Sequence, residues 1–186
     1  MILLYIVIGL VIVLGLSVVG IYNSLVTFSM RVKEAWADID VQLKRRYDLI
    51  PNLVNTVKGS TNFETSTLEK VIAARSNALG ATTPKEAGVA DVAMRGALSG
   101  FFALAESYPD LKSNQNFISL QNELSDTENK IQAARRFYNG VVMDYNTKIQ
   151  TVPTNIFANM FSYTASEFFE LEEGEQAARN PVEVKF

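Results

Sequence analysis

Histidine and cysteine are both missing from this sequence of 186 residues. Their absence excludes disulfide frameworks, Cys/His zinc sites, thiolate nucleophiles and imidazole acid–base catalysis. No carboxylate spacing supports hydrolysis either, so we expect no enzymatic activity, no cofactor and no metal site. The formal net charge of −3 lacks the basic excess that nucleic-acid binding requires, and we expect no nucleic-acid partner.

Charge is also missing from the start of the chain, because none of the 17 Lys and Arg residues or the 20 Asp and Glu residues precedes Arg31. Residues 1–22 are apolar apart from the Ser17 hydroxyl, and as a helix they are ~33 Å long, enough for a hydrocarbon core of ~30 Å. This segment has neither the basic start nor the cleavage site of a signal peptide. We therefore predict a retained transmembrane anchor over residues 1–25, with Tyr22 near its end, at headgroup level.

The rest of the chain has a helical period between its prolines. A first apolar stripe runs from Val32 to Val57 and continues in register past Pro51, so we expect Pro51 to kink this helix without ending it. No breaker separates the anchor from this stripe, and the two are predicted to form one helix. Whether Gly59 then breaks the chain is left open.

Three further long helices follow from start and stop signals. A capping box from Thr61 to Glu64 predicts a second helix to about Leu79, with Leu68, Val71, Ile72 and Leu79 facing inward. Thr83-Pro84-Lys85-Glu86 predicts a third helix to about Glu106. The fourth helix steps by three and four from Phe117 to Ile149 before Val152-Pro153 ends it. The predicted fold is all-α, an N-terminal transmembrane helix followed by an antiparallel up-and-down bundle of about four long helices within residues 26–169.

Two groups of side chains are candidate contact sites. Lys44, Arg45 and Arg46 form a basic triplet suited to anionic headgroups or to an acidic face of a partner, although Asp40 and Asp48 lie at ion-pair spacing and favour a solvated face. The second group consists of aromatic residues after Pro153, namely Phe157, Phe161, Tyr163, Phe168 and Phe169.

The aromatic group has three interpretations: a cap on the bundle core, a contact with the membrane interface, or a contact with a partner protein. If four helices alternate in direction, the fourth returns to the bilayer and the aromatic residues emerge near its surface. With only three segments they would lie at the far end. The acidic residues beyond them predict a loosely ordered, solvated tail over residues 170–186.

Several long strings carry a family resemblance. RRYDLIPNLV over residues 45–54 is the most specific, and LEKVIAARSNA over 68–78 and RRFYNGVVMDYN over 135–146 accompany it. With the preceding membrane span, these strings make the chain similar to the LemA family of bacterial membrane proteins. The resemblance implies an anchored helical bundle without an established molecular function. Some relatives belong to magnetosome membranes, and others lie beside membrane-protease or stress genes.

The resemblance implies a single-pass protein of the bacterial cytoplasmic (inner) membrane. Its orientation stays open, because Arg31 and Lys33 after the span favour a cytoplasmic domain only mildly. Our leading functional hypothesis is a non-enzymatic scaffold that forms homo-oligomers in the lipid bilayer and organises other membrane proteins, such as a membrane protease. The alternatives are a membrane-shaping or lipid-interacting protein and a small-molecule sensor bundle.

Overall fold

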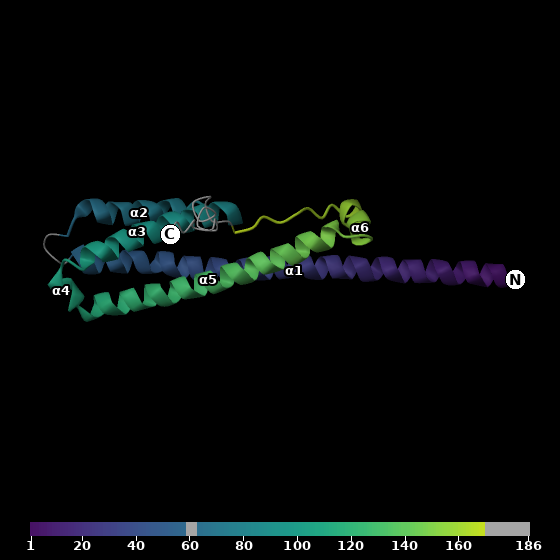
Figure 1. Ribbon diagram of the computed structural model, residues 1–186, viewed down its shortest axis with the longest axis horizontal. Helices are drawn as coiled ribbons and strands as arrows, with labels where there is room; N and C mark the ends of the chain where they lie inside the picture. The colour runs from purple at the N-terminus through teal and green to yellow at the C-terminus, as the bar shows by residue number, and fades with distance from the viewer. Residues whose placement is uncertain (59–62, 170–186) are drawn as a thin grey trace, which may run out of the picture. The chain divides into compact units, whose positions relative to one another are not determined.

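The computed structural model of the protein describes residues 1–58 and 63–169 (Figure 1). The helices in these ranges are α1 Ile2–Lys58, α2 Thr65–Leu79, α3 Pro84–Ala105, α4 Pro109–Lys112, α5 Gln115–Gln150 and α6 Thr154–Met160. The prediction of an all-α helical bundle is confirmed. The predicted break at Gly59, the cap at Thr61 and the tail over 170–186 lie outside the described residues.

Helix α1 is continuous from the apolar N-terminal segment into the bundle, as the unbroken pattern predicted. It passes through Pro51 without ending. Proline has no N–H, so the carbonyl of Tyr47, four residues earlier, loses its usual helical donor. The Nε atom of Arg75 in α2 donates to this carbonyl at 2.8 Å. A side chain from the next helix thus replaces the hydrogen bond that Pro51 removes.

Within residues 1–58 and 63–169, two helices, α1 and α3, are long and apolar enough to cross a membrane by length and composition. They differ in burial, because none of the apolar stretch of α1 is buried, whereas 33% of that of α3 is. Helix α3 also contributes Met94, Leu98 and Phe101 to the core. The N-terminal part of α1 is therefore the better candidate for a membrane anchor.

The chain divides into two compact units, and α1 and α5 each contribute to both. Unit 1 comprises residues 1–37 and 136–167. Unit 2 comprises residues 38–135, together with the described residues Phe168 and Phe169. Each unit therefore has its own packing between a part of α1 and a part of α5.

Unit 2 holds the helical bundle, in which successive long segments reverse direction (Figure 1). The predicted start of α3 is confirmed in detail. Thr83 Oγ1 accepts a hydrogen bond from the Glu86 N–H at 3.2 Å, and a Glu86 carboxylate oxygen accepts one from the Thr83 N–H at 3.2 Å. The N–H and hydroxyl of Thr82 donate to the same carboxylate, and these hydrogen bonds lower the pKa of Glu86.

The inward face predicted for the second helix is partly wrong. Ile72 and Leu79 are 45% and 55% exposed, whereas α2 buries Leu68, Val71, Ala74 and Ala78. Residues spaced by three and four from Leu68 form a stripe whose small alanines permit close approach to α3. Ile72 lies about 100° around the helix from Val71 and so falls outside that stripe.

Two short helices, α4 and α6, were not predicted, and each begins at or directly after a proline. Pro109 occupies the first position of α4, and Pro153 is the N-cap residue of α6. A proline that ends one helix is equally suited to begin the next, because its fixed φ matches the first helical turn.

Candidate functional site

The three residues of the predicted basic triplet differ in burial, because they point to different sides of α1. Lys44 and Arg45 are exposed, as a solvated face requires. Arg46 is fully buried, so its assignment to that face is wrong. The spacing offered a signal, because Arg46 lies three residues after Leu43 and four before Ile50, which are both buried. A residue at those separations faces the same side of a helix as its apolar neighbours.

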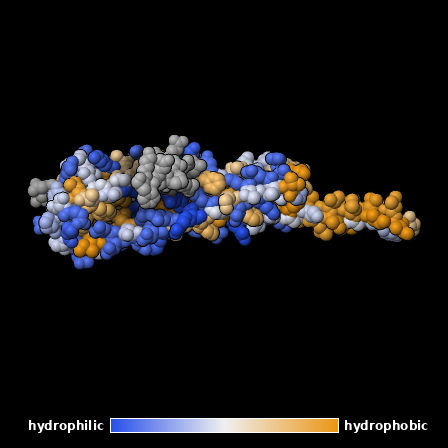
Figure 2. Space-filling model, in the orientation of Figure 1, coloured by the Kyte–Doolittle hydropathy of each residue, from blue (hydrophilic) through white to orange (hydrophobic). Residues whose placement is uncertain are grey.

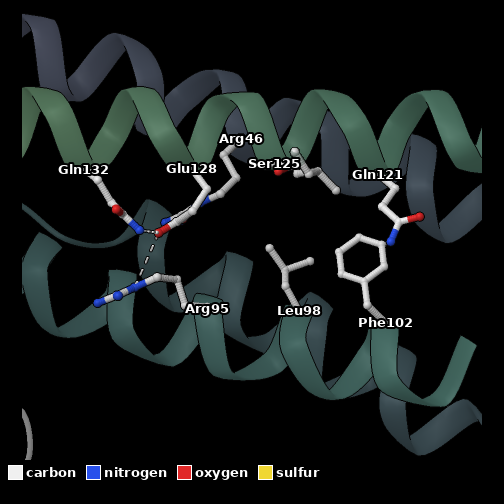
Figure 3. Close-up of a pocket in the computed structure, with 9 residues that line it drawn as sticks. Arg46, Arg95, Leu98, Phe102, Gln121, Ser125, Glu128 and Gln132 are labelled. Carbon is white, nitrogen blue, oxygen red and sulfur yellow. Dashed lines mark hydrogen bonds and ion pairs between the residues drawn. The ribbon is translucent and has the colours of Figure 1, made fainter. Parts of the chain in front are cut away.

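Arg46 is the centre of an ion cluster that joins α1, α3 and α5 in unit 2 (Figure 3). Its Nη2 atom donates to Asp91 Oδ1 of α3, and its Nη1 atom donates to Glu128 Oε2 of α5 at 2.7 Å. Arg95 Nε lies 3.2 Å from Asp91 Oδ2 and 3.9 Å from Glu128 Oε1. The Arg46 and Asp91 side chains are each 1% exposed. Asp91 was also missed by sequence reasoning, although it stands three residues before buried Met94.

The ion cluster balances two positive charges with two negative ones, so no net charge is buried. Burial of these charges costs hydration free energy. Their mutual attraction offsets that cost only when the geometry is good and further hydrogen bonds form. Gln132 Nε2 supplies one of these by donating to Glu128 Oε1 at 3.3 Å. The ion cluster therefore fixes the positions of three helices in unit 2.

A cleft of about 410 Å³ adjoins the ion cluster between α3 and α5 (Figure 3). Its apolar wall includes Leu98, Phe102 and Leu124, and its polar wall includes Gln121 and Ser125. Arg46, Arg95 and Glu128 line one end, and their charges are paired within the ion cluster. The cleft can accept a small neutral or apolar group, and it supplies no buried excess charge that would select an ion.

The aromatic residues after Pro153 also do not form one group. Phe161 is 42% exposed, whereas Phe169 is 1% exposed. Phe157, Tyr163 and Phe168 are half-buried. The Phe161 ring meets the Tyr22 ring edge to face, with centroids 5.0 Å apart and planes at 69°. Phe169 thus fits the core interpretation, while Phe161 lies in unit 1 beside the end of the apolar segment.

The chain after α6 is held along α5 by polar side chains of the string over residues 135–146. A positive φ of 59° at Ser162 turns the chain at the end of α6. The Tyr145 hydroxyl then donates to the Thr164 carbonyl at 2.9 Å, and Asn146 exchanges two hydrogen bonds with the backbone of Ser166 at 3.0 and 2.9 Å. We call residues 163–167 the return segment.

Tyr138 provides the last of these contacts. Its hydroxyl donates to the carbonyl of Glu167 at 2.8 Å, and its ring packs against that of Trp36 with centroids 5.7 Å apart. Burial, helped by the negative charge of Glu167, raises the pKa of Tyr138 to about 12. Burial likewise raises the pKa of Tyr145. Both tyrosines fall on the stepped pattern from Phe117 to Ile149, but that pattern gave no sign of the return segment as their partner.

Comparisons with known proteins identify one family model and several relatives. The sequence model of the LemA family matches residues 35–186. A protein named LemA from Metamycoplasma hominis is 31% identical over 172 residues, which cover 87% of this chain and 77% of the relative. Magnetosome proteins named MamQ from Paramagnetospirillum magneticum and Magnetospirillum gryphiswaldense are each 25% identical. These alignments cover 80% of this chain and 64% of each magnetosome protein, so the chain spans less than two thirds of their length.

Proposed function

The chain belongs to the LemA family, and from its structure we propose that it is a non-enzymatic, membrane-anchored scaffold that self-associates and organises other membrane proteins. The continuity of α1 carries this proposal. Residues 1–17 are all exposed and almost entirely apolar, whereas Leu25, Ile39 and Leu53 farther along the same helix are fully buried. One helix thus joins a candidate anchor to the cores of both units.

This arrangement suits a scaffold because it leaves no flexible linker between anchor and bundle. A single-pass topology in a bacterial inner membrane is part of the proposal. The name MamQ, which the relatives carry together with the word magnetosome, is compatible with a role in organising a membrane but assigns no reaction.

The outer face of α2 supports contact with other chains. Ile72 and Leu79, seven residues apart, lie on one face of this helix and are both exposed. Val89 of α3 is also exposed, beside a groove lined by small residues such as Ala90 and Ala93. We call Ile72, Leu79 and Val89 the α2–α3 face. The exposed apolar residues Ile72 and Leu79 on one face of α2 support a contact with another chain, and a second copy of the chain is the partner we propose first.

Cysteine crosslinking in native membranes tests this proposal, because the chain contains no cysteine of its own. Ile72→Cys and Leu79→Cys place a thiol on the α2–α3 face, and Asn129→Cys on exposed α5 is the matched control. We expect oxidation to give disulfide-linked dimers at the first two positions and not at the third. Monomers at all three positions, together with a single-chain size in membranes, would contradict self-association.

A further inference from the structure

Two large apolar side chains of helix α6 are exposed. Ile156 and Met160, one turn apart, are 58% and 65% exposed, and Val152 just before the helix is 77% exposed. The buried positions of the helix are Thr154 and Ala158. A surface helix in water has the opposite arrangement, with its apolar stripe toward the core. We call Val152, Ile156, Met160 and Phe161 the α6 face.

The α6 face lies at the end of the apolar segment of α1. Phe161 packs against Tyr22, and both residues belong to unit 1. Tyr22 is three residues before Leu25, the first fully buried residue of α1. Figure 2 shows the hydrophobic rod of the N-terminal segment and a hydrophobic surface over α6 near its base. The α6 face is therefore continuous with the surface that a bilayer would cover.

Two basic side chains, Arg31 of α1 and Lys148 of α5, lie beyond Tyr22 in unit 1. The Arg31 guanidinium lies 5.7 Å and the Lys148 ammonium 5.9 Å from the centre of the Phe28 ring. Phe28 is six residues beyond Tyr22, which is ~9 Å along the helix axis. The headgroup layer on one side of a bilayer is ~5–7 Å thick, so a ring ~9 Å beyond Tyr22 lies at the outer, aqueous edge of that layer. The order of apolar, aromatic and basic residues along unit 1 thus matches the order of layers at a membrane surface.

We propose that the α6 face inserts into the bilayer beside the anchor, at the boundary between acyl chains and headgroups, with anionic headgroups near Arg31 and Lys148. This rests on the proposed function, because it requires the N-terminal part of α1 to span the membrane. Unit 1 then contacts lipid at two places, which fixes its tilt and depth. Lipid is favoured over a protein partner because the face adjoins the candidate span directly through Tyr22.

Fluorescence quenching of the full-length protein in vesicles of phosphatidylcholine and phosphatidylglycerol tests this contact. Ile156→Cys and Met160→Cys are each labelled with an environment-sensitive fluorophore. Val19→Cys on the exposed apolar segment is the control for lipid, and Asn129→Cys is the control for water. Because the replaced side chains are exposed, each variant should keep the helical circular-dichroism spectrum of the parent.

We expect lipids spin-labelled near the headgroup to quench positions 156 and 160 at least as strongly as position 19, and iodide to quench only position 129. Quenching of 156 and 160 by iodide would overturn the inference in favour of a solvated face. Protection from both quenchers would overturn it in favour of a protein contact. If Val19 is quenched by lipid and the α6 positions are not, only this inference fails. If Val19 is not quenched by lipid, the anchor in the proposed function fails as well.

Discussion

At the scale of single residues, two charged side chains occupy helix positions at which the apolar pattern predicts core residues. Arg46 and Asp91 each fall on the inward stripe of their helix, and each is buried against the other. Charge alone predicted solvation for Arg46, but helical position decided its burial. The buried guanidinium of Arg46 also lies next to Tyr47. Burial raises the pKa of the Tyr47 phenol, and the positive charge of Arg46 only partly offsets this rise.

The ion cluster predicts an asymmetry between single and double substitutions. Asp91→Ala leaves the buried Arg46 with Glu128 as its remaining acceptor in the cluster, and we expect a loss of about 3–5 kcal/mol in stability, the usual effect of breaking a buried pair. Arg46→Met combined with Asp91→Leu removes both buried charges and should cost much less. Thermal melting followed by circular dichroism measures both variants. A double variant less stable than Asp91→Ala would contradict this account.

The hydrogen bond from Arg75 to the Tyr47 carbonyl predicts coupling with Pro51. Arg75→Ala should cost about 1–3 kcal/mol, because it leaves a partly buried carbonyl without a donor. In a Pro51→Ala background, the new backbone N–H can reach the same carbonyl, so the identical substitution should cost less. A double-mutant cycle on melting measures the difference. Purely additive effects would show that Arg75 does not replace the donor that proline removes.

At the scale of elements, helix boundaries could be predicted where local chemistry determines them. The Thr83 capping box begins α3 as expected, and the stepped pattern from Phe117 to Ile149 lies within α5. The inward residues of α2 could not be predicted, because this short helix has apolar residues on two faces and only packing against α3 determines which face is buried. The return segment could not be predicted because hydrogen bonds to Tyr138, Tyr145 and Asn146 position it, and these leave no periodic pattern.

The return segment predicts a loss of stability in alkali. The folded pKa of Tyr138 is about 12, against an ordinary value of 10.0. The unfolded chain therefore loses this proton first, and the contribution of Tyr138 is complete below pH 10.0 and disappears as pH rises to about 12. Tyr138→Phe should be less stable at neutral pH by ~1 kcal/mol, for the lost hydrogen bond.

Melting temperatures across this alkaline range measure the effect. The variant should show a shallower decline than the parent, although Tyr47 and Tyr145, whose pKa values are also raised, keep some decline in both. Parallel curves for the two proteins would mean that Tyr138 titrates normally in the folded chain.

At the scale of the whole molecule, two segments far apart in the sequence come together in unit 1. Phe161, directly after α6, packs against Tyr22 of α1, where the apolar segment ends. The sequence predicted that the chain after the fourth helix returns to the anchor only if four helices alternate in direction. The number of helices could not be predicted from the helical period, because a break at Gly59 was left open. What the chain does with its outward apolar faces depends on partners, which no pattern in one sequence identifies.

The central claim is that this protein acts by association within a membrane. Its most direct test is the mass of the full-length chain released from native membranes in lipid nanodiscs, without detergent. The account predicts particles that contain two or more copies of the 20.6 kDa chain, alone or with another membrane protein. Particles that contain one copy and no other protein, at the expression level of the native cell, would contradict it.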